Sequence, residues 1–201
     1  MTDVQLRPAG DRGALLELPE GTAPRVARVL AAELPVLVDV VPGHRTVLVT
    51  WGEEPPGDLL ALAARAIDEG DVPAALRAIE IPVVYDGADL EAVAGFTGLS
   101  VDAVVAAHSR PDYTVAFLGF SPGFAYLVGG DERLHVPRLD EPRRRVPAGT
   151  VAIAGPYSGV YPRESPGGWR LLGTTDVVLF DPDRRPPPLL APGDRVRFLP
   201  T

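Results

Sequence analysis

Apolar residues in the first part of the chain follow two spacings, one typical of strands and one typical of helices. Short apolar segments bounded by turn residues predict strands at Val4–Arg7, Ala14–Leu18, Val36–Val41, Thr46–Trp51 and Ile79–Tyr85. Two other segments carry apolar residues three to four positions apart, which predicts amphipathic helices after Pro24 and from Asp58 to Glu69. Together these elements predict a small α+β unit with one helix-covered sheet.

After Tyr85 the pattern changes to two short helices, followed by strands and loops only. Asp89 and Ser100 are expected to open these helices, the first of which runs through Val93. Further along, short apolar segments alternate with turns rich in Gly and Pro. They predict strands at Thr114–Leu118, Ala125–Val128, Val151–Ala154, Trp169–Thr174, Val177–Phe180 and Val196–Leu199. Many short strands with frequent turns are typical of a closed or nearly closed β-barrel.

The expected fold class is therefore α+β, with an N-terminal α+β domain over residues 1–80 and a β-barrel domain over residues 81–201. The boundary is placed near residue 80, although the strand predicted at Ile79–Tyr85 could belong to either side. At 46% apolar and 23% charged residues, the chain is apolar enough to build a core.

The composition excludes several chemistries. Every one of the 19 basic residues is Arg, and Cys is absent. A Lys Schiff base, a biotin or lipoyl group on Lys, a P-loop Lys, a disulfide and a Cys nucleophile are therefore impossible on this chain. The net charge of −8 leaves neither half with the basic excess that nucleic-acid binding needs.

The first residues carry no basic flank before an apolar stretch, and no apolar run approaches a membrane span. We therefore expect a cytoplasmic protein that binds neither nucleic acid nor membrane.

Residues 119–123 match the G-x-S-x-G pattern of serine hydrolases and follow a predicted strand. The chemistry argues against a Ser121 nucleophile, because the next residue is Pro122, which has no backbone N–H for an oxyanion. The following segment also resembles a strand rather than the required helix. The same segment is better interpreted as a rigid surface loop in which Phe120, Phe124 and Tyr126 supply aromatic surface, and its alternative is an ordinary barrel turn.

Two further segments suggest a binding surface. Arg138 and the run Arg143–Arg145 form either a solvated rim or a clamp for carboxylate or phosphate. The segment from Tyr161 to Arg170 places Glu164, two Pro, two Gly and Trp169 before a predicted strand. It is either a long hairpin connection or a functional surface, and we favour the second.

The three histidines, His44, His108 and His135, are far apart and show no metal-ligand spacing, so no His-based metal site is expected. His108 lies four residues after Val104 on an apolar helix face. A position at a helix end or in the core is the favoured interpretation, and acid–base catalysis is the alternative.

In this order, the motifs of the second half resemble the 5-oxoprolinase B-subunit family, also described as allophanate hydrolase subunit 1 or as the sporulation-kinase-inhibitor family. The resemblance runs from Ile81 to about Phe180. It rests on the segments 81–85, 98–100, 119–127, 137–138, 146–155, 159–162 and 164–170, together with His108. Two positions depart from the family pattern, since Ala125 stands where Pro is usual and Val128 where Gly is usual.

The resemblance implies a small N-terminal α+β sandwich domain and a C-terminal cyclophilin-like β-barrel of the carboxyltransferase type. It also implies two partners, the C subunit with its homologous barrel and the A subunit, with which this chain would open 5-oxoproline to glutamate. The complex would use ATP as co-substrate, with a divalent metal, and the isolated chain would be inactive or nearly so. Two alternatives are a regulatory protein that inhibits a histidine kinase and a subunit for allophanate or urea-carboxylase chemistry.

The candidate site residues fall into three groups. The catalytic candidates are His108, Glu164 and Arg170, and Glu164 is expected to support Arg170. The candidates for binding substrate or anions are Arg138, Arg145, Gly149, Gly167 and Gly168. The candidates for the partner interface are Phe120, Pro122, Phe124, Tyr126 and Trp169.

Overall fold

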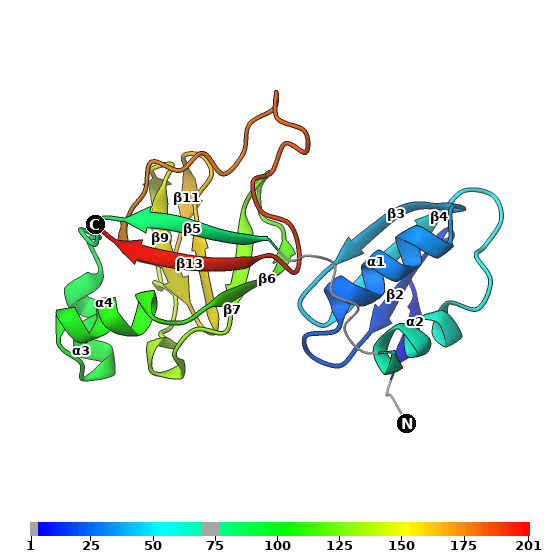
Figure 1. The fold of residues 1–201 in the computed structure, drawn as a ribbon, viewed down its shortest axis with the longest axis horizontal. Helices are drawn as coiled ribbons and strands as arrows, with labels where there is room; N and C mark the ends of the chain where they lie inside the picture. The colour runs from blue at the N-terminus through cyan, green and yellow to red at the C-terminus, as the bar shows by residue number, and fades with distance from the viewer. Residues whose placement is uncertain (1–3, 70–76) are drawn as a thin grey trace. The chain divides into compact units, whose positions relative to one another are not determined.

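The computed structural model describes residues 4–69 and 77–201. The chain forms two compact units, residues 1–75 and 76–201, and each is described by itself (Figure 1). The fold class is α+β, as the sequence predicts, with one small helix-covered sheet and one larger, barrel-like sheet.

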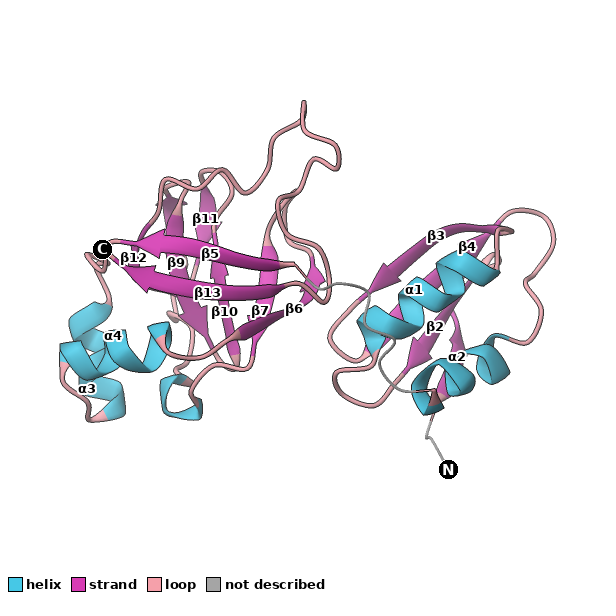
Figure 2. Cartoon of the chain, viewed as in Figure 1, coloured by secondary structure: helices cyan, strands magenta, loops and turns pink. Residues whose placement is uncertain are grey.

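The first unit is an antiparallel sheet of four strands in the order β1-β2-β4-β3, with helices on one side (Figure 2). The strands are β1 (Gln5–Pro8), β2 (Gly13–Glu17), β3 (Leu37–Pro42) and β4 (Thr46–Trp51), and the helices are α1 (Ala23–Glu33) and α2 (Leu59–Asp68). Pro24 lies in the first turn of α1, and the Asp58 side chain caps α2 by accepting a hydrogen bond from the Ala61 N–H. The buried faces of both helices and the sheet form one apolar core.

The second unit is a seven-stranded sheet in the order β12-β9-β10-β7-β6-β13-β5. Its strands are β5 (Ala78–Val83), β6 (Tyr113–Leu118), β7 (Ala125–Val128), β9 (Thr150–Ala154), β10 (Tyr157–Val160), β12 (Arg170–Thr174) and β13 (Arg195–Pro200). Val84 and Thr174 exchange two backbone hydrogen bonds of 2.9 and 2.8 Å beyond the end of β5. These bonds join the two edge strands and bring the sheet close to a closed barrel.

Two helices and a short second sheet complete this unit. Helices α3 (Leu90–Thr97) and α4 (Val101–Ser109) pack with the 3₁₀ turn η1 (Glu132–Leu134) over an apolar cluster that includes Ile153 and Leu172. The short strands β8 (Arg143–Val146) and β11 (Ser165–Gly167) pair with each other outside the main sheet.

Most predicted elements are present with small shifts, and the differences lie where the sequence is rich in Gly and Pro. Val177–Phe180 is not a strand, because only Phe180 makes an isolated bridge, to Pro188. Strands β8, β10 and β11 were not predicted, since each is short and two of them contain Gly. The first helix of this unit continues past Val93 to Thr97 and ends at Gly98, whose φ of 70° favours glycine.

The strand that the sequence placed on either side of the boundary lies wholly in the second unit. β5 pairs in parallel with β13 from Ala78 to Val83, so that its first three residues do not belong to the N-terminal sheet. In the part of the chain that the structure describes, no single helix has the length and apolarity to cross a membrane, and only the bent pair α3 and α4 passes that test by length and composition.

Candidate functional site

The loop between β6 and β7 carries the G-x-S-x-G residues in a strained, tightly bonded turn. Phe120 has a φ of 64°, a left-handed conformation that is costly for a residue with a bulky side chain. The turn is held by backbone hydrogen bonds from Gly119 to Phe124, from Ser121 to Gly119 and from Phe124 to Ser121. Gly123, at a φ of 81°, passes so close to Phe180 that a Cβ would lie 2.6 Å from the Phe180 Cβ. Phe120 is 60% exposed.

This loop forms one wall of a pocket of about 280 Å³, which we call the aromatic pocket. Its lining comes from segments that are distant in sequence: Phe120, Phe124, Tyr126, Arg138, Pro142, Tyr161, Pro166, Gly167 and Trp169. Rings from the β6–β7 loop therefore meet rings from the ends of β10 and β11, and a single guanidinium group lies at the same pocket.

The rings of the pocket pack edge to face. Phe124 meets Trp169 at a centroid distance of 5.3 Å and an interplanar angle of 85°, and it meets Tyr161 at 5.4 Å and 76°. Phe120 lies 5.4 Å from Phe124 at 74°. Such contacts fix each ring by its neighbours, so the walls are preformed.

The absence of a side chain at Gly159 leaves room for the packed rings of Phe124 and Trp169. A Cβ at Gly159 would lie 3.0 Å from the Ala125 carbonyl oxygen and within 3.2 Å of the Phe124 and Trp169 rings. A residue larger than glycine would therefore displace the floor of the pocket.

The polar groups of the pocket are few and carry no negative charge. Among the described residues, no carboxylate pairs with Arg138, which is exposed. Burial raises the pKa of the Tyr126 hydroxyl, and the positive charge of Arg138 acts in the opposite direction. Burial likewise raises the pKa of Tyr161, while a hydrogen bond with the Trp169 backbone acts against that rise. Both phenols are therefore protonated donors at neutral pH.

A buried ion pair connects β8 to Asp89, the residue that precedes α3. The Asp89 carboxylate, only 5% exposed, accepts hydrogen bonds from Arg143 at 2.8 Å and from the Leu171 N–H at 2.7 Å. Because Leu171 lies two residues after Trp169 and Arg143 pairs with Gly167 across β8 and β11, this carboxylate holds both segments that flank the pocket. It acts as a structural group.

The other predicted arginines do not line the aromatic pocket. Arg145 pairs with Glu164 at 2.6 Å, and both side chains are exposed. Arg170 instead stacks over the Phe96 ring at 4.9 Å and donates from Nε to the Pro137 carbonyl oxygen at 3.1 Å. The expectation that Glu164 supports Arg170 is therefore wrong, since the two side chains have different partners.

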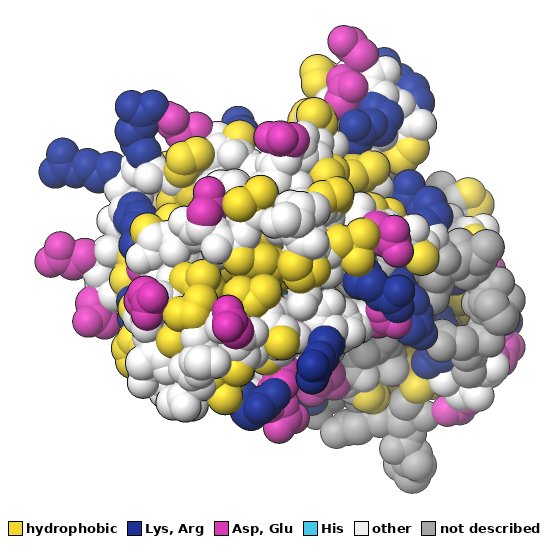
Figure 3. Space-filling model, turned by 60° about the vertical axis from the view of Figure 1, so that its left-hand side comes forward, with side chains coloured by type: hydrophobic (Ala, Val, Ile, Leu, Met, Phe, Trp, Pro, Cys, Tyr) yellow, Lys and Arg dark blue, Asp and Glu magenta, His cyan; other side chains and the backbone are white. Residues whose placement is uncertain are grey.

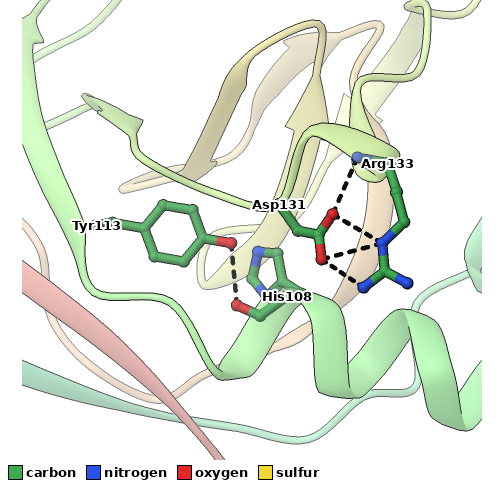
Figure 4. A network of polar contacts seen from close by, with 4 residues as sticks. All are labelled: His108, Tyr113, Asp131 and Arg133. Atoms are coloured by element: carbon green, nitrogen blue, oxygen red, sulfur yellow. Dashed lines mark hydrogen bonds and ion pairs between the residues drawn. The ribbon is translucent and has the colours of Figure 1, made fainter.

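His108 lies in the core with both ring nitrogens occupied. Nδ1 is 2.7 Å from the Tyr85 hydroxyl, Nε2 is 2.8 Å from Ser158 Oγ, and the ring stacks on Phe198 at 4.6 Å. Figure 4 shows the Tyr113 hydroxyl bonded to the His108 carbonyl oxygen, and the neighbouring Asp131 bonded to Arg133. Burial lowers the pKa of His108 from 6.5 to about 3, so the ring is neutral. This geometry favours the core role over proton transfer.

Some of the predicted backbone donors and interface residues line the aromatic pocket, and others do not. The Gly149 N–H is already bonded to the Tyr161 carbonyl oxygen, so Gly149 does not offer a free donor to an anion. Gly168 lies beside Arg138, and Pro122 is exposed without lining the pocket. Phe124 and Trp169 are 2% and 7% exposed and line the aromatic pocket, and their place at a partner interface stays a prediction.

Ser121 does not have the surroundings of a nucleophile. Its Oγ is buried and makes no hydrogen bond within the described ranges 4–69 and 77–201. A serine nucleophile needs a base within hydrogen-bond reach, so this geometry agrees with the argument from Pro122.

A larger hollow, of about 360 Å³, lies where the barrel closes. It is lined by Pro82, Val84, Thr174, Thr175, Asp176, Val177 and Thr201, a set with no aromatic ring and no cation. The aromatic pocket is the stronger candidate site, because it combines rigid rings with convergent polar groups.

The described residues contain no cluster of side chains that suits a divalent metal. They contain no group of three or more His, Asp or Glu side chains that could hold a metal ion, and the aromatic pocket carries no carboxylate. On the face drawn in Figure 3, arginines and acidic side chains are interspersed around apolar areas rather than gathered in one basic patch.

Sequence reasoning missed three residues that line the pocket. Tyr161 is 1% exposed and lies so close to Gly167 that a Cβ there would be 2.2 Å from the Tyr161 hydroxyl. Pro142 and Pro166 also line the pocket. The available signal was the position of Tyr161 and Pro166 in the same Gly- and Pro-rich segment as Trp169.

The fold belongs to a known class of domain. The family described as "Carboxyltransferase domain, subdomain C and D" matches residues 4–190. The chain is also 48% identical over 174 residues to the 5-oxoprolinase B subunit of Escherichia coli O157:H7, covering 84% of this chain and 80% of that protein. The 5-oxoprolinase B subunit of Bacillus subtilis is 48% identical over 126 residues, which cover 61% of this chain and 52% of that protein. The chain therefore belongs to the 5-oxoprolinase B-subunit family.

Solved structures agree with this assignment at the level of the fold. TTHA0988 is 42% identical with a TM-score of 0.79, and the match covers 94% of this chain and 40% of that one. The urea carboxylase of Kluyveromyces lactis has a TM-score of 0.75 at 22% identity, over 100% of this chain and 22% of that chain, and shares the fold. The chain thus spans less than half of these solved proteins, and its curated relatives are named as subunits of an enzyme.

Proposed function

We propose that this chain is a subunit of an ATP-dependent 5-oxoprolinase, which opens the lactam ring of 5-oxoproline to give glutamate. The observation that carries the proposal is the 48% identity to a protein named as a 5-oxoprolinase subunit over 84% of this chain. The aromatic pocket supports it, because it offers a preformed site with one cation and without competing acids.

Chemistry explains why such a reaction needs ATP. A lactam carbonyl is a poor electrophile, so the γ-phosphoryl group is transferred to the carbonyl oxygen and ADP leaves. Water then attacks the ring carbon, the ring nitrogen departs as the amine, and a second water hydrolyses the resulting acyl phosphate to glutamate and phosphate. This sequence requires a nucleotide site and cations on the phosphates.

We propose that two partners, the homologous-barrel C subunit and the A subunit, provide what this chain lacks. The chain contains no Lys, and its described residues contain no acidic cluster for a divalent metal. In this proposal ATP and its metal are held outside this chain, and the isolated chain is inactive or nearly so. The curated relatives are named as subunits, which agrees with an enzyme assembled from several chains.

The test is reconstitution of this chain with the A and C subunits from the same organism. Glutamate and ADP are measured with and without 5-oxoproline, and with each subunit omitted in turn. The proposal expects turnover that depends on 5-oxoproline and requires this chain. Full turnover in its absence, or none in the complete mixture, would overturn the proposal.

A further inference from the structure

We propose that the aromatic pocket holds the closed-ring form of the substrate, a small lactam that carries one carboxylate, and that Arg138 binds this carboxylate. The inference rests on the proposed function, and it assigns the ligand chemistry of a site for which the fold alone gives no role. In this proposal Arg138 and the rings of the pocket bind the closed lactam more tightly than the opened product.

The first step of the argument is charge. Among the residues that line the pocket, Arg138 is the only fully charged group, and the described part of the chain gives it no carboxylate partner. Its neighbours differ, since Arg143 is paired with Asp89 and Arg145 with Glu164. A guanidinium group beside a partly enclosed pocket offers two parallel N–H donors that match a carboxylate. The ligand therefore carries one negative charge.

The second step is shape. The walls are ring faces and edges from Phe120, Phe124, Tyr126, Tyr161 and Trp169, held by mutual contacts at centroid distances between 5.1 and 6.3 Å. Such walls stabilise a compact, flat group through dispersion and burial of apolar area, and they do not stabilise an additional negative charge. A small ring meets this requirement.

The third step concerns the lactam carbonyl group of the ligand. Both pocket phenols remain protonated, because burial raises their pKa values. Tyr126 lines the pocket, and its hydroxyl is a donor that can bond to a lactam carbonyl oxygen. A hydrogen-bond donor at the carbonyl oxygen and a cation at the carboxylate together orient a lactam carboxylate.

The same features act against the opened product. Ring opening creates a second carboxylate and an ammonium group, while the pocket has one cation and no acid. Burying the second carboxylate without a cation of its own costs free energy, so the product leaves. The pocket therefore favours substrate over product without any moving part.

Phe120 supplies the wall that is open to solvent. Its left-handed backbone, at a φ of 64°, holds a 60% exposed ring edge to face with Phe124 and Tyr161. Strain of this kind persists where the surrounding structure imposes it, and it often accompanies function. Removing this ring should weaken binding without opening a cavity in the core.

The experiment uses the fluorescence of Trp169 in the full chain, with Trp51→Phe as the background so that a single tryptophan reports on the pocket. The probes are 5-oxoproline, 2-pyrrolidinone, which lacks the carboxylate, and glutamate, the opened product. We expect 5-oxoproline to bind about 10- to 100-fold more tightly than 2-pyrrolidinone, the range that one charge-assisted contact to Arg138 gives. Glutamate should bind at least about 10-fold more weakly than 5-oxoproline.

The variants are Arg138→Ala, Arg138→Lys, Phe120→Ala and the matched control Arg144→Ala, whose side chain is exposed outside the pocket. Arg138→Ala should lose the preference for 5-oxoproline over 2-pyrrolidinone and leave the affinity for 2-pyrrolidinone unchanged. Arg138→Lys should recover part of that preference, Phe120→Ala should weaken both ligands, and Arg144→Ala should match the parent chain.

The reconstituted complex separates this inference from the proposed function. If the complex is active and Arg138→Ala leaves the KM for 5-oxoproline unchanged, the pocket assignment is wrong and the proposed function stands. If the complex is inactive but 5-oxoproline binds with the Arg138 dependence described above, the proposed function is wrong and the pocket assignment stands. A lack of any saturable Trp169 response to 5-oxoproline, in the chain and in the complex, would overturn the assignment.

Discussion

The His108 cluster, formed by His108, Tyr85, Tyr113, Ser158 and Phe198, and the aromatic pocket both place one basic group among rings. In the His108 cluster every hydrogen-bonding atom of the imidazole has a partner within the core. In the aromatic pocket the basic group, Arg138, is exposed and has no carboxylate partner in the described part of the chain. In the His108 cluster the hydrogen-bonding atoms of the basic group are bonded to other core residues. In the aromatic pocket the guanidinium group of Arg138 has no carboxylate partner among the described residues, so it is available to a ligand.

This difference shows why residue type alone is a weak guide to function. Histidine is a common acid–base catalyst, yet burial here lowers the pKa of His108 to about 3, so its ring is neutral at neutral pH. Arginine is frequently a solvated surface residue, yet Arg138 lies at a preformed pocket. The available hydrogen-bonding groups distinguish the two regions better than the residue names do.

The largest expected change in the free energy of unfolding is at Phe124, a buried residue that also lines the aromatic pocket. Phe124→Ala removes a ring that is 2% exposed and contacts Trp169 and Tyr161, so it should lower the free energy of unfolding by about 3–5 kcal/mol. Phe120→Ala, at an exposed position, should stay within about 0.5 kcal/mol of the parent. Urea unfolding of both variants tests this, and equal stability of the two would show that Phe124 is not a core residue.

The next effect tests the His108 cluster. His108→Ala removes a fully buried ring and leaves the Tyr85 and Ser158 hydroxyls without their partner, which should cost about 3 kcal/mol of unfolding free energy. His135→Ala, at an exposed position, serves as the control and should change little. A His108→Ala protein with parental stability but a lost catalytic rate in the complex would reverse our interpretation of the cluster.

A smaller effect is a pH dependence that belongs to the cluster alone. Burial lowers the pKa of His108 from 6.5 in the unfolded chain to about 3 in the folded one. Between these values the unfolded state binds a proton that the folded state does not, so stability falls as the pH decreases through this window. The slope contributed is at most about 1.4 kcal/mol per pH unit.

His108→Gln should remove this contribution, so its stability should depend less steeply on pH between 6.5 and 5 than that of the parent. Urea midpoints at several pH values measure the slopes, and His135→Gln provides the matched substitution at an exposed histidine. Identical slopes for the parent and His108→Gln would contradict a depressed pKa at His108.

The smallest effect on stability is expected at the pocket cation. Arg138 makes no ion pair with the described residues, so Arg138→Ala should change the free energy of unfolding by less than about 0.5 kcal/mol. Arg143→Ala should be clearly more destabilising, because it leaves the buried Asp89 carboxylate without its cation. Thermal unfolding of the two variants compares them, and a large loss of stability in Arg138→Ala would make Arg138 a structural residue.

Much of the local structure could be predicted because its causes lie within a few residues. Asp58 and Ser100 were expected to open helices, and each side chain accepts a hydrogen bond from the N–H three residues later. The strand at Thr46–Trp51 has the predicted limits, since its apolar alternation matches the pleat of a half-buried strand. Val177–Phe180 was predicted wrongly because an apolar run between turns looks the same whether or not a neighbouring strand accepts its hydrogen bonds.

The sequence by itself determined the α+β class, most of the elements, the absence of Lys and Cys chemistry, and the segments that carry rings and arginines. It also placed Trp169 and Arg170 next to each other at the start of a predicted strand. Only the tertiary structure decided which face is inside, and it placed Trp169 at the aromatic pocket and Arg170 over Phe96. The pairing of Glu164 with Arg145 likewise depends on the short sheet of β8 and β11. These choices follow from contacts between segments far apart in the chain, whose register and packing are set by the whole barrel rather than by any local pattern.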